Sequence, residues 1–348
     1  MFERRDHDRV PRSDYYWPET ITRWQHEGLI GDDQTVLNLL GNDFLRICRV
    51  ALEPFPGRYE VIGEDAETRT VRDGWGGIVK VWKNKYHPPG HIRFGCDSHE
   101  VWEKEFKPSL LGAGLQIDLD DVEKMYIAGR KAGLWCCLAG LETFEVTRKF
   151  MGDEVTLIAM ATDPAWILDV SRTYTDQLLW HFETILGLGI KPDGVWLVGD
   201  MAYSCGPLCS PAMYRELIWP DHKRVADWTH AHSMKLIYHT DGDVRKVIDM
   251  FIEAGFDCLQ PLEAKANMDI RKLCPKYGDQ LALFGNIDAM VMMSNDREKI
   301  EQEVVSKLAA GMATRGYAYH SDHSVPPGVS WESYRFIIDL LDRYGVYA

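Results

Sequence analysis

The segment "KLIYHTDGDVRKVIDMFIEAGFDCLQPLE", residues 235–263, contains one complete strand–helix–strand unit. It begins with an apolar run, passes through a polar turn into a stretch with helical periodicity, and ends in a second apolar run at 257–263. Two strands joined by a crossover helix of this length pair in parallel. The segment therefore predicts a parallel sheet that is covered by helices.

The same pattern recurs through the second half of the chain. Apolar strand candidates occur at residues 194–200, 235–242, 257–263, 281–288 and 316–323. Their helical partners are expected at roughly 210–232, 243–255, 268–277, 295–311 and 330–343. Consecutive units of this kind, with continuous apolar strands, fit either a doubly wound sheet or a closed (β/α)8 barrel.

The first half adds fewer elements of this type. Two more strands are predicted, at 43–52 and 134–140, and a long amphipathic helix at 163–189 begins with Asp163 as its cap and Pro164 in its first turn. Residues 60–86 alternate between polar and apolar side chains and are rich in Gly, Thr and Val, which predicts an antiparallel hairpin laid over the barrel.

The sequence contains no linker and no change of composition that would mark a domain boundary. We therefore expect one domain over residues 1–348. It divides into an N-terminal helical and hairpin extension at 1–130, with the first barrel strand near 43–52, and the main barrel units at 131–348.

Bulk composition restricts the class of protein. Of the 348 residues, 45% are hydrophobic and 26% are charged, which is the balance of a soluble globular protein. The net charge of −14 argues against nucleic acid or an anionic membrane as a partner. No apolar run is long enough to span a membrane, and the first twenty residues lack the apolar core of a secretory signal. Eight scattered cysteines form no disulfide framework, so we expect a cytoplasmic protein with reduced thiols.

Polar side chains collect where the predicted strands end, which is where a parallel barrel has its active site. His239 and Asp241 lie two residues apart on an extended segment and therefore point to the same side. Asp243, which follows them, is expected to cap the next helix. The strand-end residues are Asp200, His239, Asp241, Gln260, Glu263, Asn286, Asp288, His320, Asp322 and His323.

This pattern is compatible with a metal site. Zinc takes three or four ligands from His, Cys and carboxylate side chains, and His239, Asp241 and Asp322 could supply three, with His323 as an alternate. The oxygen ligands leave Mg²⁺ or Mn²⁺ open as well. A polar site without a metal, in which His239 and Asp241 form an acid/base or binding pair, is the alternative interpretation.

Several longer stretches resemble the uroporphyrinogen decarboxylase superfamily over roughly residues 130–345. They are "SPAMYRELIWPDHKR" (210–224), "EAGFDCLQPLE" (253–263), "KYGDQLALFGNID" (276–288) and "DHSVPPGVSWESY" (322–334), together with the histidine-ended strand. Upstream, "WPETITRWQHEGL" (17–29) and "TVRDGWGGIVKVW" (70–82) resemble a divergent branch of that superfamily. The resemblance implies a (β/α)8 TIM barrel with an N-terminal helical and β-hairpin extension.

The resemblance implies one of two chemistries. Decarboxylases of this superfamily need no cofactor and carry an N-terminal Arg-Gln-Ala-Gly-Arg-Tyr motif. Here Gly57, Arg58 and Tyr59 match the end of that motif, whereas residues 54–56 are Pro-Phe-Pro. The pocket for an eight-carboxylate tetrapyrrole is therefore disfavoured. A lyase that acts on a carboxylated substrate, with Asp288 or Asp200 handling the proton, stays as the alternative, and a non-enzymatic binding barrel is less favoured.

The other group comprises corrinoid-dependent methyltransferases, whose zinc is held by a His-x-Cys motif and a late Cys. By position these ligands fall on His239, Asp241 and Asp322, so both thiolates are replaced by carboxylates. That replacement argues against a thiol substrate and suits the oxygen of a methyl ether. The resemblance thus implies a component of the O-demethylase type. It would move a methyl group from a methoxylated, aromatic or otherwise methylated small molecule to a separate corrinoid protein.

The roles implied for individual residues follow from this reading. Asp200 and Glu263 are candidates for proton transfer or substrate orientation, Asn286 for a hydrogen bond to substrate, and Tyr203 for contact with the leaving group. Zinc and a partner-borne corrinoid are the expected cofactors, and homodimerisation is left open. The side chains that could wall an aromatic donor are Tyr15, Tyr16, Trp17, Trp75 and Trp82.

Overall fold

The structure is a computed structural model that describes residues 1–84 and 89–347. Its centre is a parallel sheet of seven strands whose neighbours follow one another in chain order. This order confirms the predicted parallel units and excludes a doubly wound sheet, in which the strand order reverses part-way. The strands are β1 (Phe44–Arg46), β6 (Trp135–Leu141), β7 (Gly194–Val198), β10 (Lys235–Thr240), β11 (Cys258–Pro261), β12 (Ala282–Phe284) and β13 (Tyr317–Ala318).

The parallel sheet curls around its own inner face. The ring of Phe44 in β1 lies 4.8 Å, centroid to centroid, from the ring of Phe284 in β12, although β12 is five strands away along the sheet. In a flat sheet five strand spacings would separate them by roughly 24 Å. All seven strands contribute to one inward cluster, which consists of Phe44, Cys137, Ala139, Trp196, Ile237, Cys258, Ala282, Phe284 and Ala318.

The predicted closed barrel of eight strands is confirmed only in part, because the described residues place seven strands in this sheet. The N-terminal segment around Arg12 lies between its two edges. Arg12 forms a parallel bridge with Tyr319, just beyond β13, and its carbonyl accepts a hydrogen bond of 2.9 Å from the amide of Asp43, just before β1. A segment without strand geometry of its own is thus placed where an eighth strand would be expected.

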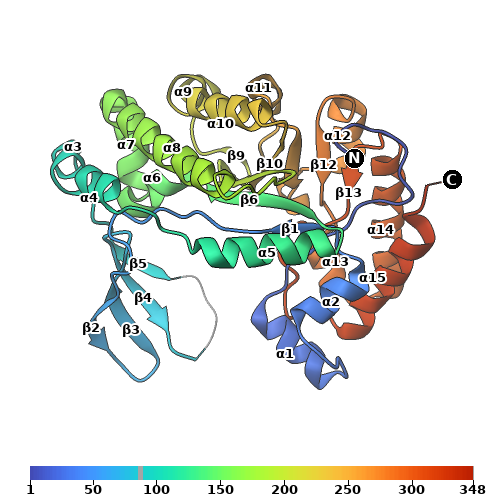
Figure 1. Cartoon of the computed structure of the whole chain (residues 1–348). Coiled ribbons are helices and arrows are strands. Elements are labelled where there is room, and N and C mark those ends of the chain that lie inside the picture. The colour runs from blue at the N-terminus through green and yellow to red at the C-terminus, as the bar shows by residue number, and fades with distance from the viewer. Residues whose placement is uncertain (85–88, 348) are drawn as a thin grey trace.

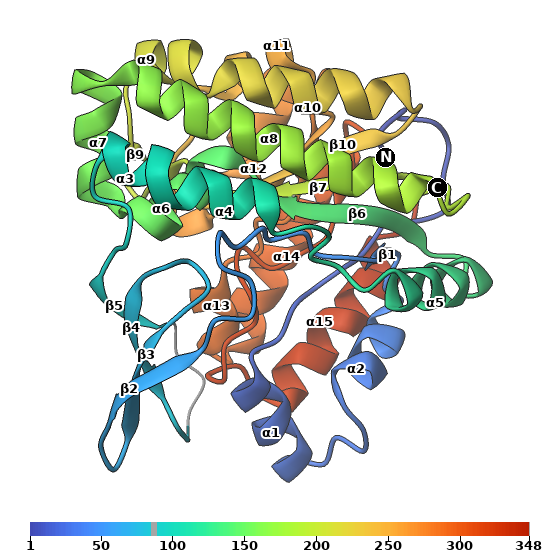
Figure 2. The ribbon, with the colours of Figure 1, turned by 60° about the vertical axis from the view of Figure 1, so that its left-hand side comes forward.

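Helices cover the outer face of the sheet (Figures 1 and 2). They are α5 (Leu119–Lys131), α6 (Thr143–Met151), α7 (Asp153–Thr162), α8 (Pro164–Leu186), α9 (Pro211–Leu217), α10 (Trp219–Ala231), α11 (Ile248–Ala254), α12 (Ile270–Tyr277), α13 (Ala289–Met293), α14 (Arg297–Met312) and α15 (Trp331–Tyr344), with a 3-10 turn η2 (Ala264–Ala266). Among the described residues, no helix is both long and apolar enough to cross a membrane.

Local sequence signals set where the helices begin. Asp163 accepts a hydrogen bond of 3.2 Å from the amide of Trp166, as its predicted cap role requires. The helix expected at 210–232 is instead two helices, α9 and α10, because Pro220 lacks the amide that would continue α9. The helix expected from residue 243 begins only at Ile248. Asp243 accepts from the amide of Arg245 instead of capping α11.

The N-terminal extension contains more structure than the predicted hairpin. Its strands β2 (Glu60–Glu64), β3 (Thr68–Arg72), β4 (Ile78–Trp82) and β5 (Gly90–Arg93) form one antiparallel sheet, and residues 85 and 86 of the predicted hairpin lie outside the described residues. This sheet extends away from the parallel sheet rather than covering it (Figures 1 and 2). The other elements are α1 (Pro18–His26), α2 (Asp33–Leu40), α3 (His99–Val101), the π-helical turn η1 (Trp102–Phe106), α4 (Lys107–Gly112) and a small hairpin of β8 (Ala202–Tyr203) and β9 (Gly206–Pro207).

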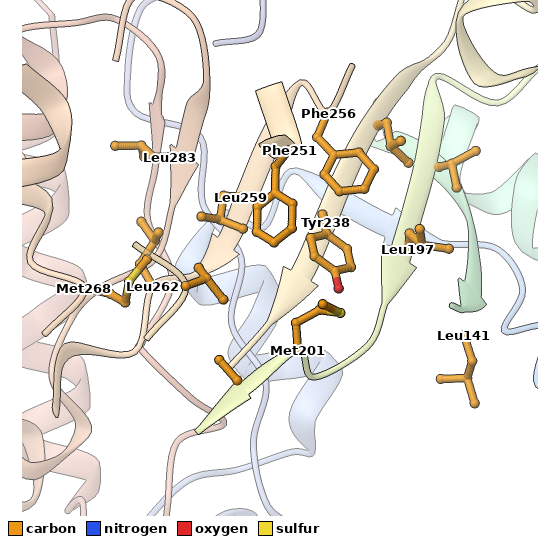
Figure 3. Close-up of a cluster of buried hydrophobic side chains, with 14 of the residues drawn as sticks. Leu141, Leu197, Met201, Tyr238, Phe251, Phe256, Leu259, Leu262, Met268 and Leu283 are labelled. Carbon is orange, nitrogen blue, oxygen red and sulfur yellow. The ribbon is translucent and has the colours of Figure 1, made fainter. Parts of the chain in front are cut away.

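The packing beneath α11 fixes the orientation of β10 (Figure 3). The buried ring of Tyr238 lies 4.7 Å from that of Phe256 and 5.1 Å from that of Phe251, and its hydroxyl donates to the carbonyl of Gly199 at 3.0 Å. Because side chains alternate along a strand, burying Tyr238 toward the helices turns His239 toward the interior of the curled sheet.

Candidate active site

The inward face of the sheet changes from apolar to mostly polar toward the ends of the strands. Residues two positions beyond members of the inward apolar cluster share its face, because side chains on a strand repeat every second residue. We call five of these residues the strand-end layer: Arg46, Val198, His239, Gln260 and His320. The apolar cluster thus forms a floor below a more polar mouth at the carboxyl ends of the strands, where parallel barrels place their chemistry.

His239 is held in one orientation by its neighbour in the strand-end layer. Its Nδ1 lies 2.5 Å from Oε1 of Gln260. An amide oxygen can only accept, so Nδ1 carries the proton and Nε2 keeps its lone pair. Nε2 lies 3.9 Å from Oδ1 of Asp200, and the His239 side chain is 25% exposed. This arrangement suits a metal ligand or a base.

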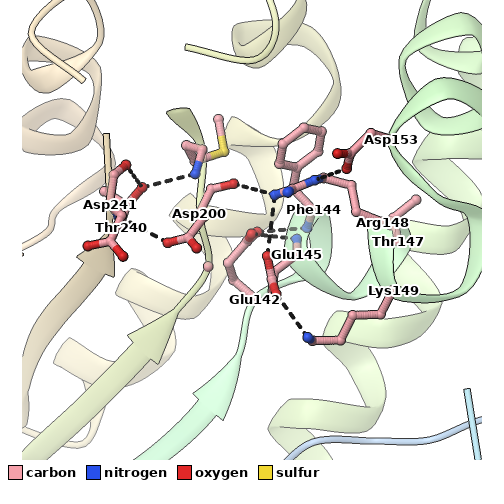
Figure 4. Close-up of polar contacts among 12 residues, drawn as sticks. Glu142, Phe144, Glu145, Thr147, Arg148, Lys149, Asp153, Asp200, Thr240 and Asp241 are labelled. Atoms are coloured by element: carbon pink, nitrogen blue, oxygen red, sulfur yellow. Dashed lines mark hydrogen bonds and ion pairs between the residues drawn. The ribbon is translucent and has the colours of Figure 1, made fainter. Parts of the chain in front are cut away.

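Asp200 and Asp241 lie side by side after β7 and β10. The amide of Asp241 donates to Oδ1 of Asp200 at 3.0 Å (Figure 4). The carbonyl of Asp200 accepts from Arg148 in α6 at 2.6 Å, and Arg148 also pairs with Asp153 at 2.6 Å. Arg148 therefore anchors the loop after β7 and leaves the carboxylate of Asp200 available, with 42% of the Asp200 side chain exposed.

Asp241 has an unsatisfied oxygen. Burial raises the pKa of its carboxyl group, His239 opposes that shift, and the negative charge of Asp200 adds to it. Its Oδ1 is buried and has no hydrogen-bond partner among the described residues, while Oδ2 lies 3.8 Å from Nε2 of His323. A buried carboxylate oxygen without a partner is costly, and a nearby cation would offset that cost.

The side chains of Asp200, His239 and Asp241 fit a divalent metal. One potential ligand atom from each lies within 4.8 Å of the other two. A neutral imidazole with two carboxylates is a zinc donor set, and its oxygen content also suits Mg²⁺ or Mn²⁺. Of the ligands expected from the sequence, His239 and Asp241 are brought together, and His323 lies beside Asp241. Asp200, expected to be catalytic, completes the group.

Asp322 lies outside this group and contacts two loops. It is buried, and its Oδ2 accepts from the amide of Ala264 at 3.0 Å while Oδ1 accepts from the amide of Ala289 at 2.9 Å. Burial raises the pKa of Asp322 to about 6. Both carboxylate oxygens are thus engaged in joining the loop after β11 to the loop after β12.

Asn286 is also engaged by the backbone. Its Oδ1 accepts from the amide of Ile270 at 2.9 Å, and Nδ2 donates to the carbonyls of Leu262 and Met268, both at 2.6 Å. Both amide protons are used, and the side chain is fully buried. Asn286 therefore holds the loop between β11 and α12 and offers substrate no free donor. Asp288, the proton-handling candidate of the lyase alternative, caps α13 through the amide of Met290 at 2.7 Å.

Glu263 and Tyr203 border the turn after β10. Oε2 of Glu263 accepts from the amide of Gly242 at 2.8 Å, and the carbonyl of Tyr203 accepts from the amide of Asp243 at 2.9 Å. Gly242 has φ +84°, and a Cβ there would lie 2.5 Å from the backbone of Ala202. A glycine is therefore required for the β8–β9 hairpin to pack against this turn. The Tyr203 side chain is 52% exposed.

Gln260 and Arg46 are members of the strand-end layer that had no assigned role in the sequence analysis. Gln260 orients His239, and Arg46 lies at the end of β1. The signal that could have found them is the alternation of side chains along a strand, in which every second residue lies on the same face. Gln260 follows Cys258, and Arg46 follows Phe44, each by two positions on an inward-facing strand.

Comparisons with known proteins agree with this architecture. Residues 194–344 match the family model for uroporphyrinogen decarboxylase (URO-D). The resemblance to the uroporphyrinogen decarboxylase superfamily is confirmed. The URO-D match begins at β7 and extends into α15, so it includes Asp200, His239 and Asp241.

Among solved structures, a methyltransferase from Methanosarcina mazei matches with a TM-score of 0.65 and 13% identity, over 99% of this chain and 96% of that chain. At this identity the likeness shows a shared fold. Comparison with curated proteins gave no match.

Proposed function

We propose that this protein is a methyltransferase that takes a methyl group from a methylated small molecule, and that Asp200, His239 and Asp241 bind a divalent metal, in the first instance zinc. The observation that carries the proposal is the buried, unpartnered Oδ1 of Asp241 beside an imidazole whose Nε2 lone pair is held ready by Gln260. The fold shared with the Methanosarcina mazei methyltransferase gives further support.

A zinc ion bound there would supply Lewis acidity toward the oxygen of a methyl ether. The chain's own residues prepare the site. Gln260 keeps the proton of His239 on Nδ1, and Asp200 and Asp241 provide two negative charges in a partly buried setting. His323 is 44% exposed and 3.8 Å from Asp241, so its Nε2 can hold a proton for the departing oxygen.

The methyl acceptor that we propose is the cobalt(I) of a corrinoid carried by a separate protein, which would approach the strand ends. The methyl group would leave its oxygen as a cation equivalent, and the C–O electron pair would remain on an alkoxide or phenoxide that then takes up a proton. Carboxylates in place of thiolates favour this oxygen chemistry, because hard ligands leave the metal more electrophilic toward oxygen.

Methyl transfer to free cob(I)alamin, followed by absorbance, tests the proposal with panels of methyl ethers, amines and thioethers. We expect transfer from at least one ether, a loss of more than about 100-fold in His239→Ala, and no change in the matched variant His26→Ala, whose side chain is exposed on α1. Absence of transfer from every donor class, or equal rates in wild type and His239→Ala, would contradict the proposal.

A further inference from the structure

Arg46 is an arginine whose hydrogen-bonding groups have no protein partner. It ends β1 on the inward face and is half-buried. Its guanidinium carbon lies 4.2 Å from the ring centroid of Tyr15 and 5.5 Å from that of Trp196. No hydrogen bond or ion pair joins Arg46 to any residue in the part of the chain that the structure describes. Its planar fork of N–H donors thus lies beside two aromatic rings and is not engaged by an acceptor among the described residues.

Two other arginines that are buried or largely buried, Arg12 and Arg148, are paired with carboxylates. Arg12 pairs with Asp342 at 2.6 Å and donates to the carbonyl of Leu341 at 2.8 Å, and Arg148 is held by Asp153 and the carbonyl of Asp200. Arg46, which is half-buried, has no such acceptor among the described residues. A chain with a net charge of −14 has many carboxylates, yet none lies against Arg46 among the described residues. Of these three arginines, Arg46 alone has no acceptor among the described residues.

His320, in the same layer, adds a second unsatisfied group. It is buried, its Nδ1 lies 2.5 Å from the carbonyl of Ser321, and its Nε2 is buried without a partner among the described residues. Burial first, and then the charges of His239 and Arg46, lower the pKa of His320 to about 3. The ring of His320 lies 5.3 Å from that of Tyr15. A neutral imidazole with an unpartnered Nε2 thus lies near the same tyrosine ring as Arg46 and adds no competing charge.

We infer that Arg46 binds a carboxylate of the methyl donor, so that the substrate is a small, flat, methylated monocarboxylic acid. The guanidinium fork matches a carboxylate through two parallel hydrogen bonds. Tyr15 provides an aromatic wall for a flat group, above the apolar floor formed by Phe44, Trp196 and Phe284. This inference rests on the proposed function for the identity of the reacting group, but the binding of the acid does not require methyl transfer.

Calorimetric binding of 4-methoxybenzoate, compared with 4-methoxybenzamide, tests the inference on the full chain. Wild type is expected to bind the acid at least about tenfold more tightly than the amide, and Arg46→Gln is expected to remove that preference. Arg46→Lys, which keeps the charge without the planar fork, should retain part of it. Arg58→Gln is the matched control, because Arg58 also lies over a ring, that of Phe55 at 3.9 Å, but is exposed outside the parallel sheet.

The inference is overturned if wild type binds acid and amide equally, or if Arg46→Gln keeps the preference while its circular dichroism is that of wild type. It is also overturned if Arg58→Gln loses as much as Arg46→Gln. The two proposals fail separately. If the acid binds in an Arg46-dependent way but no methyl transfer occurs, the proposed function is contradicted and the carboxylate site is not. If methyl transfer occurs with equal KM for anionic and neutral ethers, and Arg46→Gln does not change it, the carboxylate site is contradicted and the proposed function is not.

Discussion

The ends of β7 and β10 and the ends of β12 and β13 carry the same residue types but use them in opposite ways. At the first pair, the carboxylates of Asp200 and Asp241 lie beside His239 with a buried oxygen unpartnered. At the second pair, Asn286 and Asp322 direct their side-chain hydrogen bonds to backbone groups of neighbouring loops. Whether a strand-end polar group is available for chemistry depends on whether the surrounding loops have already satisfied it.

The largest effect should come from Asn286→Ala. The change leaves the amide of Ile270 and the carbonyls of Leu262 and Met268 without their partner in a buried loop. We expect the free energy of unfolding to fall by about 4 kcal/mol, measured by urea denaturation. Asp200→Ala serves as the control from the other pair of strand ends and should cost less than about 1 kcal/mol. Equal losses in the two variants would break the comparison.

The next largest effect is a dependence of stability on pH that comes from Asp322. Its folded-state pKa of about 6 lies above the ordinary value, so between about pH 4 and 6 the folded chain holds a proton that the unfolded chain releases. Its contribution to the free energy of unfolding therefore falls as the pH rises through this window, by about 3 kcal/mol. His320, with its pKa lowered to about 3, has the opposite sign.

The Asp322 contribution is for this reason measured as the difference between wild type and Asp322→Asn in urea denaturation across pH 4 to 7. A difference that stays constant over that range would show that the carboxyl group is not shifted by burial. The account of Asp322 as a buried carboxyl group that joins the loops after β11 and β12 would then be wrong.

The smallest expected effect sharpens the description of the β10 end. Gln260→Leu removes the acceptor that keeps the His239 proton on Nδ1. We expect metal affinity to weaken by about tenfold, measured by competition with a chromogenic chelator, and the unfolding free energy to change little. Gln280→Leu, an exposed change in the turn before β12, is the matched control. An unchanged affinity in Gln260→Leu would mean that the imidazole is oriented by other contacts.

Much of the fold follows from the sequence, because the strand–helix repeat determines parallel pairing and the resemblance to the uroporphyrinogen decarboxylase superfamily favoured the barrel order. The period of two within each strand also placed His239 and Asp241 on one face. The number of strands in the sheet was less accessible, because the segment around Arg12 takes its place through contacts with Tyr319 and Asp43 rather than through a strand pattern of its own. Likewise, alternation at 60–86 predicted strand pairing but contained no information about what that sheet packs against.

The site was harder to predict for a related reason. Asn286 and Asp322 look like functional residues in the sequence because they end buried strands. Their partners are backbone groups of loops that lie 16 to 58 positions away along the chain, so no local pattern reveals that these side chains are already engaged. Arg46 presents the reverse case, since an ordinary-looking arginine in a short strand is left without a partner by the packing around it.

The claim that the β7 and β10 ends form a metal centre is tested most directly by the metal content of protein purified without chelator. Wild type should hold close to one divalent ion per chain, in the first instance zinc. Asp241→Ala should hold less than about a tenth of that, while the exposed control Asp279→Ala should match wild type. Wild type without metal after dialysis against zinc, or equal metal in wild type and Asp241→Ala, would contradict the account and leave His239 and Asp241 as a metal-free polar pair.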